Sequence, residues 1–266
     1  MGSSIDLKQM QKIEFDILRT VHTLCQENHI TYYLGYGTML GAVRHQGFIP
    51  WDDDVDIVMP RDDYRRFLQL APQYLPEHLK LCHLGNTAPY NYDFAKIQDK
   101  RTILIEDTYS YLGIESGVYI DIFSLDGYPA DEKKRRRHHK TVYFWQQLLA
   151  MYFSDPHKKR SLWKRPIVFT VQHLLSQNWI AQRLDKVKSK YPATGNAYIG
   201  YCEKSDRVIM PAAVYGTPTP CMFEGFEFNG VEQPDTYLRN LYGDYMSLPP
   251  EDQRTAHVHS VVRFRD

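Results

Sequence analysis

Apolar residues recur along this chain with spacings that predict first a helix and then a mixture of strands and helices. Residues 5–26 place hydrophobic side chains three and four positions apart, which indicates an amphipathic helix, and Asp6 with Gln9 forms a capping-box sequence at its start. Runs rich in β-branched and aromatic residues predict strands at 31–34, 79–83, 94–98, 102–105 and 118–123. A helix over 61–70 has one apolar face and is expected to cover the sheet. The pattern predicts an α/β fold built on a mixed sheet.

The pattern changes near residue 130. From there to about residue 191 the chain shows long helical periodicity without strand signals. Residues 222–228 then predict two short strand pieces around turns, and Pro234 opens a helix through Leu241. We therefore expect three parts, namely a core over 1–130, a helical subdomain rich in basic and aromatic residues over 131–205, and a C-terminal segment over 206–266 that returns to the core.

Composition and charge narrow the class of protein. With 266 residues, of which 43% are hydrophobic and 24% charged, the chain can bury a sizeable core and is typical of a globular protein. The formal net charge is zero, so nothing attracts the whole chain to nucleic acid, and we expect no nucleic-acid partner. The four cysteines form no CxxC pair, which argues against a zinc knuckle or a disulfide framework. Acidic residues stand near the N-terminus where a signal peptide needs an apolar core, so we expect a cytoplasmic protein.

Basic residues crowd one stretch despite the neutral total. Lys and Arg dominate residues 133–165, where Asp155 is the only acid, and Trp and Tyr are interleaved with them. This mixture suits the headgroup zone of an anionic membrane, where each nearby cation contributes roughly 1 kcal/mol. A helical subdomain with a solvated basic face is an equally good interpretation. The uncharged stretch 166–182 is too short and too polar for a membrane span. We expect peripheral contact through residues 133–180 with the inner face of the cell membrane.

The clearest candidate for a functional site is a run of acidic residues near the middle of the predicted core. If this run is a strand, the carboxylates of Asp52, Asp54 and Asp56 project from one face, and Val55 and Ile57 point into the core. Neighbouring carboxylates repel one another unless a cation lies between them, and hard oxygen ligands suit Mg²⁺ or Mn²⁺. We therefore predict a divalent metal site with Asp54 and Asp56 as ligands.

Two further features supply a phosphate site and a third carboxylate. Gly37 and Thr38 follow a predicted strand and precede a helix start, where backbone N–H groups and a hydroxyl can hold phosphate oxygens. Asp121 interrupts an apolar strand, where a lone carboxylate is costly unless it is paired or ligates a metal. With Asp54 and Asp56 these residues predict phosphoryl transfer, in which Asp121 completes the metal cage or accepts a proton from the attacking hydroxyl.

Three basic residues are candidate substrate contacts, and each has an ordinary alternative. Arg44 and His45 lie between the turn at Gly37–Thr38 and the acidic run. They can bind phosphate there or pair with the aspartates at 52–53. Lys96 lies in a predicted strand, where it can reach the substrate or remain a solvated edge lysine.

Two motifs carry a family resemblance. Residues 36–45 (YGTMLGAVRH) and 47–57 (GFIPWDDDVDI) resemble the signature of the LicD family of phosphocholine transferases. They are also similar to the corresponding segment of the fukutin-related proteins, which move ribitol phosphate from a CDP donor. Residues 235–250 resemble the family's C-terminal block. The likeness runs from about residue 5 to 260 and is weakest between 130 and 205.

The resemblance implies a nucleotidyltransferase-like catalytic core over residues 1–130. It assigns the phosphate turn to Gly37 and Thr38, and the metal carboxylates to Asp54, Asp56 and Asp121. It further implies that phosphocholine passes from a CDP-choline donor to a sugar hydroxyl of a lipid-linked bacterial glycan, teichoic acid or lipopolysaccharide, with release of CMP. The gap between the Gly-Thr turn and the Asp-x-Asp pair is longer than in many nucleotidyltransferases, which disfavours generic nucleotide adenylation.

The implied donor carries a quaternary ammonium, for which we predict an aromatic cage because cation–π attraction holds such groups. The sequence offers seven candidates and does not choose among Tyr32, Tyr33, Tyr90, Tyr92, Tyr109, Tyr111 and Tyr119. Two alternative functions stay open. One is transfer of another phosphorylated alcohol, such as ribitol or glycerol phosphate, from a CDP donor. The other is a non-catalytic glycopolymer-binding protein, against which the intact trio of aspartates argues.

Overall fold

The computed structural model describes the chain apart from residues 1–2, 107–110, 156–164 and 255–258. The helices are α1 (Leu7–Glu27), α2 (Tyr36–His45), α3 (Arg61–Tyr74), α4 (Glu132–Tyr152), α5 (Arg165–Leu174), α6 (Gln177–Lys188), α7 (Ala212–Tyr215) and α8 (Pro234–Tyr242), with 3₁₀ turns at Asp206–Val208 and Glu251–Gln253. The strands are β1 (Tyr33–Leu34), β2 (Asp56–Pro60), β3 (Leu79–Cys82), β4 (Ala95–Asp99), β5 (Thr102–Glu106), β6 (Tyr119–Tyr128), β7 (Tyr198–Gly200), β8 (Met210–Pro211), β9 (Thr219–Phe223), β10 (Phe226–Gly230) and β11 (His259–Phe264).

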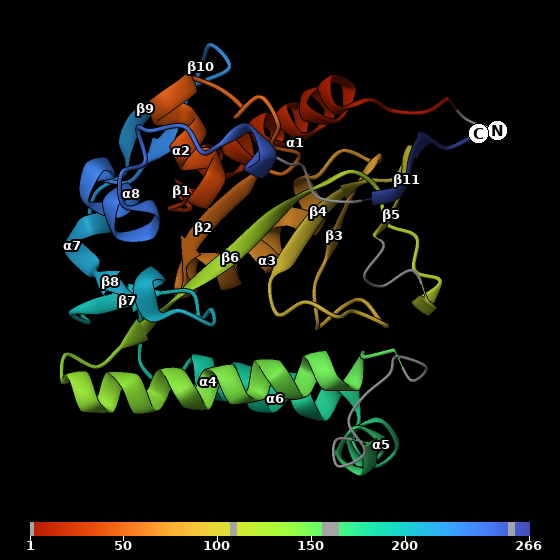
Figure 1. Cartoon of the computed structure of the whole chain (residues 1–266), viewed down its shortest axis with the longest axis vertical. Helices are drawn as coiled ribbons and strands as arrows, with labels where there is room; N and C mark the ends of the chain where they lie inside the picture. The colour runs from red at the N-terminus through yellow and green to blue at the C-terminus, as the bar shows by residue number, and fades with distance from the viewer. Residues whose placement is uncertain (1–2, 107–110, 156–164, 255–258) are drawn as a thin grey trace.

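A mixed sheet forms the centre of the molecule, as expected (Figure 1). Its main strands run in the order β1-β2-β6-β4-β3, and β7 and β8 extend it from the far end of β6. β2 and β6 are parallel, whereas β1, β4 and β3 pair antiparallel with their neighbours. The long strand β6 therefore lies between a parallel and an antiparallel partner.

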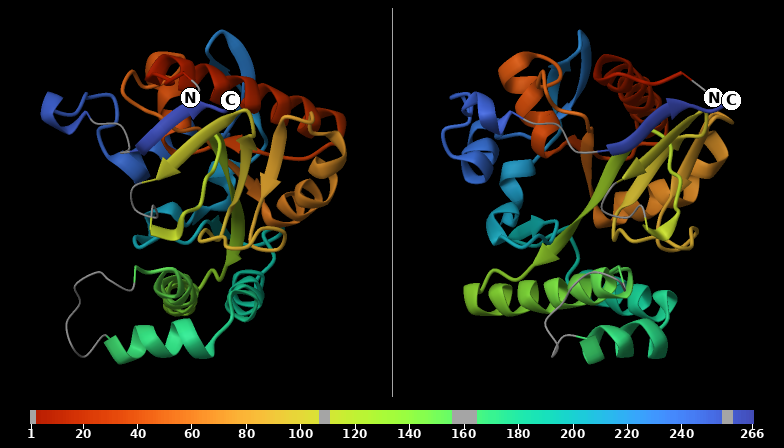
Figure 2. Two further views of the ribbon diagram at one scale, coloured as in Figure 1. Left: turned by 90° about the vertical axis from the view of Figure 1, so that its right-hand side faces the viewer. Right: turned by 45° about the vertical axis from the view of Figure 1, so that its right-hand side comes forward.

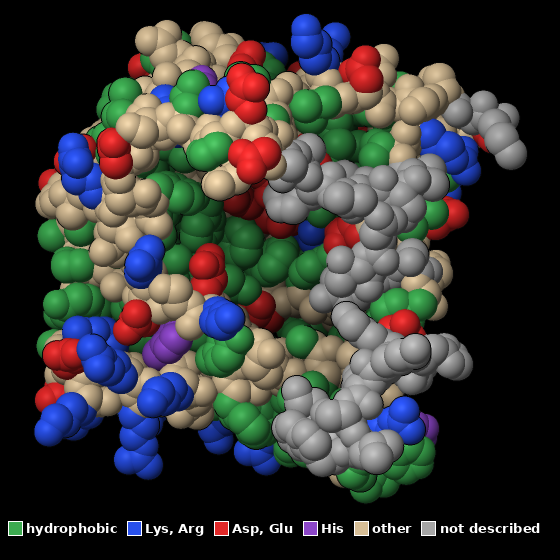
Figure 3. Space-filling model, in the orientation of Figure 1, with side chains coloured by type: hydrophobic (Ala, Val, Ile, Leu, Met, Phe, Trp, Pro, Cys, Tyr) green, Lys and Arg blue, Asp and Glu red, His purple; other side chains and the backbone are tan. Residues whose placement is uncertain are grey.

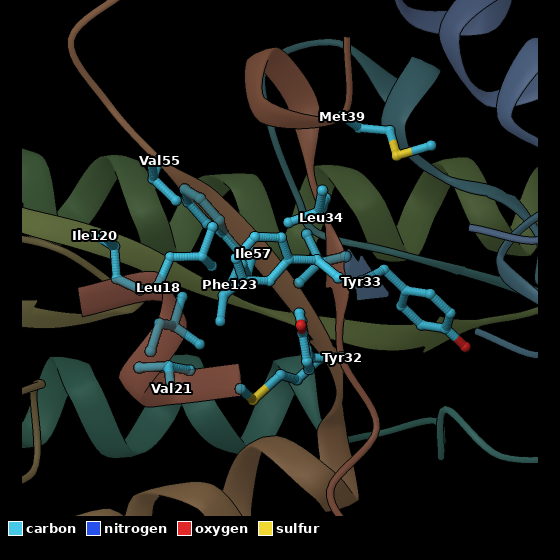
Figure 4. Close-up of a cluster of buried hydrophobic side chains, with 14 of the residues drawn as sticks. Leu18, Val21, Tyr32, Tyr33, Leu34, Met39, Val55, Ile57, Ile120 and Phe123 are labelled. Atoms are coloured by element: carbon cyan, nitrogen blue, oxygen red, sulfur yellow. The ribbon is translucent and has the colours of Figure 1, made fainter. Parts of the chain in front are cut away.

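Helices α1 and α3 cover one face of this sheet. Ile57, Ile120 and Ile122 have no exposed surface, and Figure 4 shows Ile57 and Ile120 beside Leu18 and Val21 of α1. Because side chains alternate along a strand, the neighbouring residues of β2 and β6 point to the other face. That second face faces the viewer in Figure 1, where none of the described helices covers the middle of β6.

Local signals placed the first helix correctly. α1 begins after Asp6, whose carboxylate accepts a hydrogen bond from the backbone N–H of Gln9, while the Gln9 side chain accepts one from the Asp6 N–H. Asn28 ends the helix as its C-cap. The predicted helix is confirmed, because a capping box satisfies N–H groups that the first turn leaves unpaired.

The acidic run differs from its predicted form. β2 begins only at Asp56, so Asp52 and Asp54 lie in the loop before it, and the predicted strand alternation of all three is wrong. The Asp52 N–H instead donates to the carbonyl of Ile49 in a turn. Both neighbours of β2 pair with it only from Asp56 onward, so the strand starts there.

The predicted glycine turn is also shorter than expected. Gly35 is the N-cap of α2, so Gly37 and Thr38 lie inside the first turn of that helix. Val55 and Ile57 are fully buried, which confirms their predicted place in the core.

The predicted helical stretch after residue 130 is confirmed. α4, α5 and α6 pack around their own apolar cluster, which includes Val142, Leu149, Ile180 and Leu184. Figures 1 and 2 show these helices as a layer beside the lower end of β6. The division of the chain near residue 130 stays a prediction. In the ranges that the structure describes, none of the helices combines the length and the hydrophobicity that crossing a membrane requires.

The C-terminal segment supplies three pieces that touch earlier parts of the chain. The predicted strand pieces form the antiparallel hairpin β9–β10, and the predicted helix is α8, with Gly243 as its C-cap. Helix α8 packs against α2, and β11 pairs antiparallel with β5. The hydroxyl of Tyr237 in α8 accepts a hydrogen bond from the N–H of Tyr36, so α8 fixes the start of α2.

Candidate active site

Three strands bring three charged side chains into one row on the uncovered face of the sheet. Asp56 of β2 is the direct partner of Asp121 in β6, and Asp121 is the direct partner of Lys96 in β4. Partners in a ladder project to the same side, so two carboxylates and an ammonium lie next to one another. The sequence singled out all three residues, and the sheet register unites them.

Lys96 lies at the inner end of this row. Its Nζ is 3.1 Å from Asp121 Oδ1 and 3.6 Å from Glu106 Oε1, and the side chain is 3% exposed. The alternative of a solvated edge lysine is therefore wrong. β4 is an interior strand between β3 and β6, so a charge on its site-facing side is shielded from solvent and must be paired.

Burial and nearby negative charges raise the pKa of both aspartates. Burial, followed by the charges of Asp54 and Asp121, raises the pKa of Asp56 well above its usual value. Burial also raises the pKa of Asp121, to about 6, although Lys96 opposes the rise. Like charges held this close in a partly desolvated site favour either a proton or a cation between them.

The chemistry of these donors fits a divalent cation. Carboxylate oxygens are hard ligands, and a cation would offset the repulsion that raises both pKa values. Across the described ranges, no three His, Cys, Asp or Glu side chains stand together in a ready-made metal cage. Mg²⁺ commonly binds through one or two carboxylates together with substrate phosphates, so a partial protein site suits this ion.

Helix α2 is fastened to the start of β2. The Thr38 hydroxyl accepts a hydrogen bond of 2.8 Å from the N–H of Asp56, and the Gly35 N–H donates to the Asp56 carbonyl. A Cβ on Gly37 would come within 2.9 Å of Asp52 Oδ2, so glycine lets the acidic loop lie against the first turn of α2. Gly37 and Thr38 thus lie beside the acids, at a helix N-terminus that favours anions.

Arg44 and His45 lie at the other end of α2, roughly 9 Å along the helix from Thr38. Arg44 donates from Nε to His45 Nε2 and from Nη1 to the Tyr245 carbonyl. Burial and the neighbouring Arg44 lower the pKa of His45. Both residues thus lie at the opposite end of α2 from Thr38, where burial lowers the pKa of Arg44 and the charge of Asp52 opposes the fall.

Two acidic residues near the site were missed by the sequence reasoning. Glu14 of α1 is fully buried, and among the described residues neither of its carboxyl oxygens has a hydrogen-bond partner. Burial, followed by the charges of Asp54 and Asp53, raises its pKa. Glu106 accepts hydrogen bonds from the hydroxyls of Tyr92 and Tyr119. A signal for Glu14 existed, because it lies on the apolar stripe of α1.

An aromatic wall continues the same face beyond Asp121. The ring of Phe123 lies 4.4 Å from that of Phe94, 4.8 Å from Tyr201 and 5.3 Å from Tyr36, centroid to centroid. Figure 3 shows a hollow on this face with a hydrophobic floor and acidic side chains at its upper margin. A substrate in the hollow would meet an apolar surface beside a cluster of charge.

Comparison with known proteins adds four observations. The domain described as LicD/FKTN/FKRP, nucleotidyltransferase domain, matches residues 29–153. The chain is 32% identical to the lipopolysaccharide cholinephosphotransferase LicD of Haemophilus influenzae, over 96% of this chain and 97% of that protein. An uncharacterized protein of Rickettsia typhi is 35% identical over 36% of this chain and 33% of its own length. Mannosyltransferase regulator 4 of Saccharomyces cerevisiae is 29% identical over 45% of this chain but only 10% of its own length.

Proposed function

The chain belongs to the LicD family, and on this premise we propose that it transfers phosphocholine from CDP-choline to a sugar hydroxyl of a bacterial surface glycopolymer, releasing CMP. The observation that carries the proposal is the row of Asp56, Asp121 and Lys96 on one open sheet face. The full-length similarity to a lipopolysaccharide cholinephosphotransferase favours lipopolysaccharide over teichoic acid as the acceptor.

Asp56, with Asp54 from the preceding loop, would hold Mg²⁺ or Mn²⁺ together with the donor phosphates, which leaves Asp121 to accept a proton. When bound, such an ion neutralises charge on the donor phosphates. The N-terminus of α2 would bind phosphate oxygens through the backbone N–H groups of Gly37 and Thr38. Lys96, already paired with Asp121, would add a cation at the phosphate.

The transfer needs a proton acceptor, and Asp121 suits this role. The sugar oxygen forms a bond to the phosphorus that bears choline, the bond from that phosphorus to the CMP oxygen breaks, and the hydroxyl proton passes to the Asp121 carboxylate. CMP leaves with the bridging oxygen. Burial raises the pKa of Asp121 to about 6, and a general base works best when its pKa is near the working pH.

The direct test is CMP release by the purified protein with Mg²⁺, a lipopolysaccharide acceptor and a panel of donors. We expect CDP-choline to be consumed faster than CDP-ethanolamine, CDP-ribitol or CDP-glycerol. Preferential use of CDP-ribitol or CDP-glycerol would support transfer of another alcohol phosphate. Acceptor binding without any CMP release would support the non-catalytic alternative.

The helical subdomain offers a face that suits a membrane-borne acceptor. Phe144, Ile167, Phe169 and Leu174 are exposed there, with Leu174 at 75%. Four basic side chains and Phe144 line a groove along α4, namely Lys133, Arg136, Arg137 and Lys140. Exposed apolar side chains next to cations are typical of a surface that lies on anionic lipid. We propose that this face contacts the inner side of the cell membrane.

Removing charge from α4 should weaken lipid binding. Lys133, Arg137 and Lys140 are exposed on successive turns, and replacing all three by Ser should cost about 3 kcal/mol of binding to phosphatidylserine vesicles at low salt. A Lys8→Ser, Lys12→Ser double variant on exposed positions of α1 serves as the control and should bind as the unaltered protein does. Equal sedimentation of all three proteins with vesicles would refute the membrane face.

A further inference from the structure

The structure narrows the choice of aromatic residues for a cationic headgroup. Tyr32 is fully buried, with its hydroxyl 2.5 Å from His22 Nδ1, and the Tyr33 hydroxyl donates to the Gly216 carbonyl. Both belong to the core around β1 and cannot face a substrate. Tyr109 lies outside the described residues. Tyr111 is an exposed side chain, whereas Tyr90, Tyr92 and Tyr119 lie beside the row of charged residues.

Two of these rings already surround a cation. The Lys96 Nζ lies 3.2 Å from the centroid of Tyr119 and 4.2 Å from that of Tyr92. Glu106 accepts hydrogen bonds from the hydroxyls of both tyrosines. Ring faces backed by a carboxylate stabilise positive charge, so this corner of the site is an environment for cations.

A pocket of about 90 Å³ opens next to Lys96. The volume accommodates several water molecules, which is enough for a small headgroup. Tyr90 and Tyr92 supply two of its walls, with ring centroids 5.8 Å apart and ring planes 72° from parallel. The carboxylates of Glu106 and Glu115 also line it. Lys80 is a further lining residue, but it is exposed.

The order of charges matches that of a phosphorylated amino alcohol. Lys96 lies at the junction of pocket and catalytic row, because the same ammonium contacts Asp121 and lines the pocket. A phosphate at this junction would meet Lys96. The ammonium of the same amino alcohol, two carbons beyond its phosphate ester, would meet Tyr90, Tyr92 and the two glutamates.

We propose that the pocket of Tyr90, Tyr92, Glu106 and Glu115 is the subsite for the donor's quaternary ammonium, with Lys96 at the phosphate end. The proposal rests on the proposed function and adds the residues that select choline. The rings supply cation–π attraction and the carboxylates supply compensating charge. Because the pocket is lined by groups from β3, β4, β5 and the loop at 87–92, its specificity is separate from the phosphate chemistry at Asp56.

The test compares binding of CDP-choline, CDP-ethanolamine and CDP by isothermal titration in the presence of Mg²⁺. Tyr92→Leu should weaken CDP-choline binding roughly 10-fold and leave CDP binding unchanged, because a cation–π contact is worth about 1–2 kcal/mol. Tyr92→Phe keeps the ring and should retain the preference for choline. Glu115→Gln, at an exposed position where folding is not at risk, should lower that preference severalfold. Tyr74→Leu, at an exposed tyrosine of α3, is the matched control.

The outcomes separate this subsite from the proposed function. If the unaltered protein binds CDP-choline no better than CDP and releases no CMP, the proposed function fails. If it prefers CDP-choline and both Tyr92→Leu and Glu115→Gln keep that preference, only the subsite is wrong. An equal loss of CDP and CDP-choline binding in Tyr92→Leu would likewise overturn the subsite, because the Tyr92 ring would then have only a structural role.

Discussion

Two aspartates of the same strand, Asp121 and Asp126, have opposite surroundings. They project from opposite faces of β6, since side chains alternate along a strand. Asp126 is 2.6 Å from Arg61 Nε and 3.9 Å from Lys188 Nζ, and Ser124 donates to it. Asp121 shares Lys96 with Glu106, and burial, followed by the charge of Asp54, keeps its pKa raised.

The difference separates a structural carboxylate from a functional one. The pairs around Asp126 join the core to the helical subdomain, because Arg61 also reaches Asp185 of α6 and Lys188 reaches Asp93 at 2.9 Å. Burial alone would raise the pKa of Asp93, but Lys188, Tyr201 and Gln146 lower it below its usual value. Neutralised carboxylates fasten the fold, whereas mutually repelling ones on the open face are suited to a cation and a substrate.

Among the changes that separate functional from structural carboxylates, Asp56→Asn should have the largest effect on activity. Removing one carboxylate from the cluster should lower CMP release on the order of a thousand-fold, because a bound ion contributes several kcal/mol of charge stabilisation. The melting temperature should not fall, since Asp56 is repelled by its neighbours. Asp62→Asn, at an exposed position of α3, is the control and should be fully active. A rate within tenfold of the unaltered protein would show that Asp56 is not part of the site.

Asp126→Asn should destabilise the folded protein. It should not lower the rate of CMP release as Asp56→Asn does. Two buried cations, Arg61 and Lys188, would lose a partner, which costs about 3–5 kcal/mol of unfolding free energy. Urea denaturation measures the loss. Asp185→Asn, whose side chain is 54% exposed, should cost under about 1 kcal/mol. Equal losses in the two variants would mean that burial does not distinguish these pairs.

A smaller effect should appear in the pH dependence of Asp121. Its folded-state pKa is raised from 3.8 to about 6, so the folded state holds a proton that the unfolded state has lost. Without divalent cations, this stabilisation is fully present below about pH 3.8 and is lost as the pH rises through 6. We expect a decline of about 2 kcal/mol in unfolding free energy over that range, absent in Asp121→Asn. Identical pH profiles would contradict the raised pKa.

The smallest change is expected at Glu14. Burial raises the pKa of this carboxyl well above its usual value and so favours its neutral form, which Glu14→Gln replaces by a neutral group of similar shape. The unfolding free energy at pH 6 should change by less than about 1 kcal/mol. A loss above 2 kcal/mol would show that the Glu14 carboxylate is charged and paired.

Local sequence patterns predicted most of the fold. Helix α1 follows from its apolar spacing and its Asp6–Gln9 capping box, and α8 from its initial Pro234 and terminal Gly243. These signals act within a few residues, so a single sequence contains them. The extent of β2 depends on where β1 and β6 offer partners, which local sequence does not state.

The site was predictable in its residue types but not in its arrangement. Asp56 and Asp121 were found because carboxylates beside apolar strands are costly without a function. Lys96 was left between two interpretations, because the strand order that makes β4 an interior strand arises from long-range pairing. Glu14 and Glu106 were missed for the same reason, since their neighbours come from distant parts of the chain.

The most direct test of the central claim is mass spectrometry of a lipopolysaccharide acceptor after incubation with the protein, Mg²⁺ and CDP-choline deuterated in its methyl groups. We predict an acceptor that gains one labelled phosphocholine for each CMP released, and no gain with Asp56→Asn. An acceptor left unmodified by the unaltered protein, or modified equally by Asp56→Asn, would contradict the account.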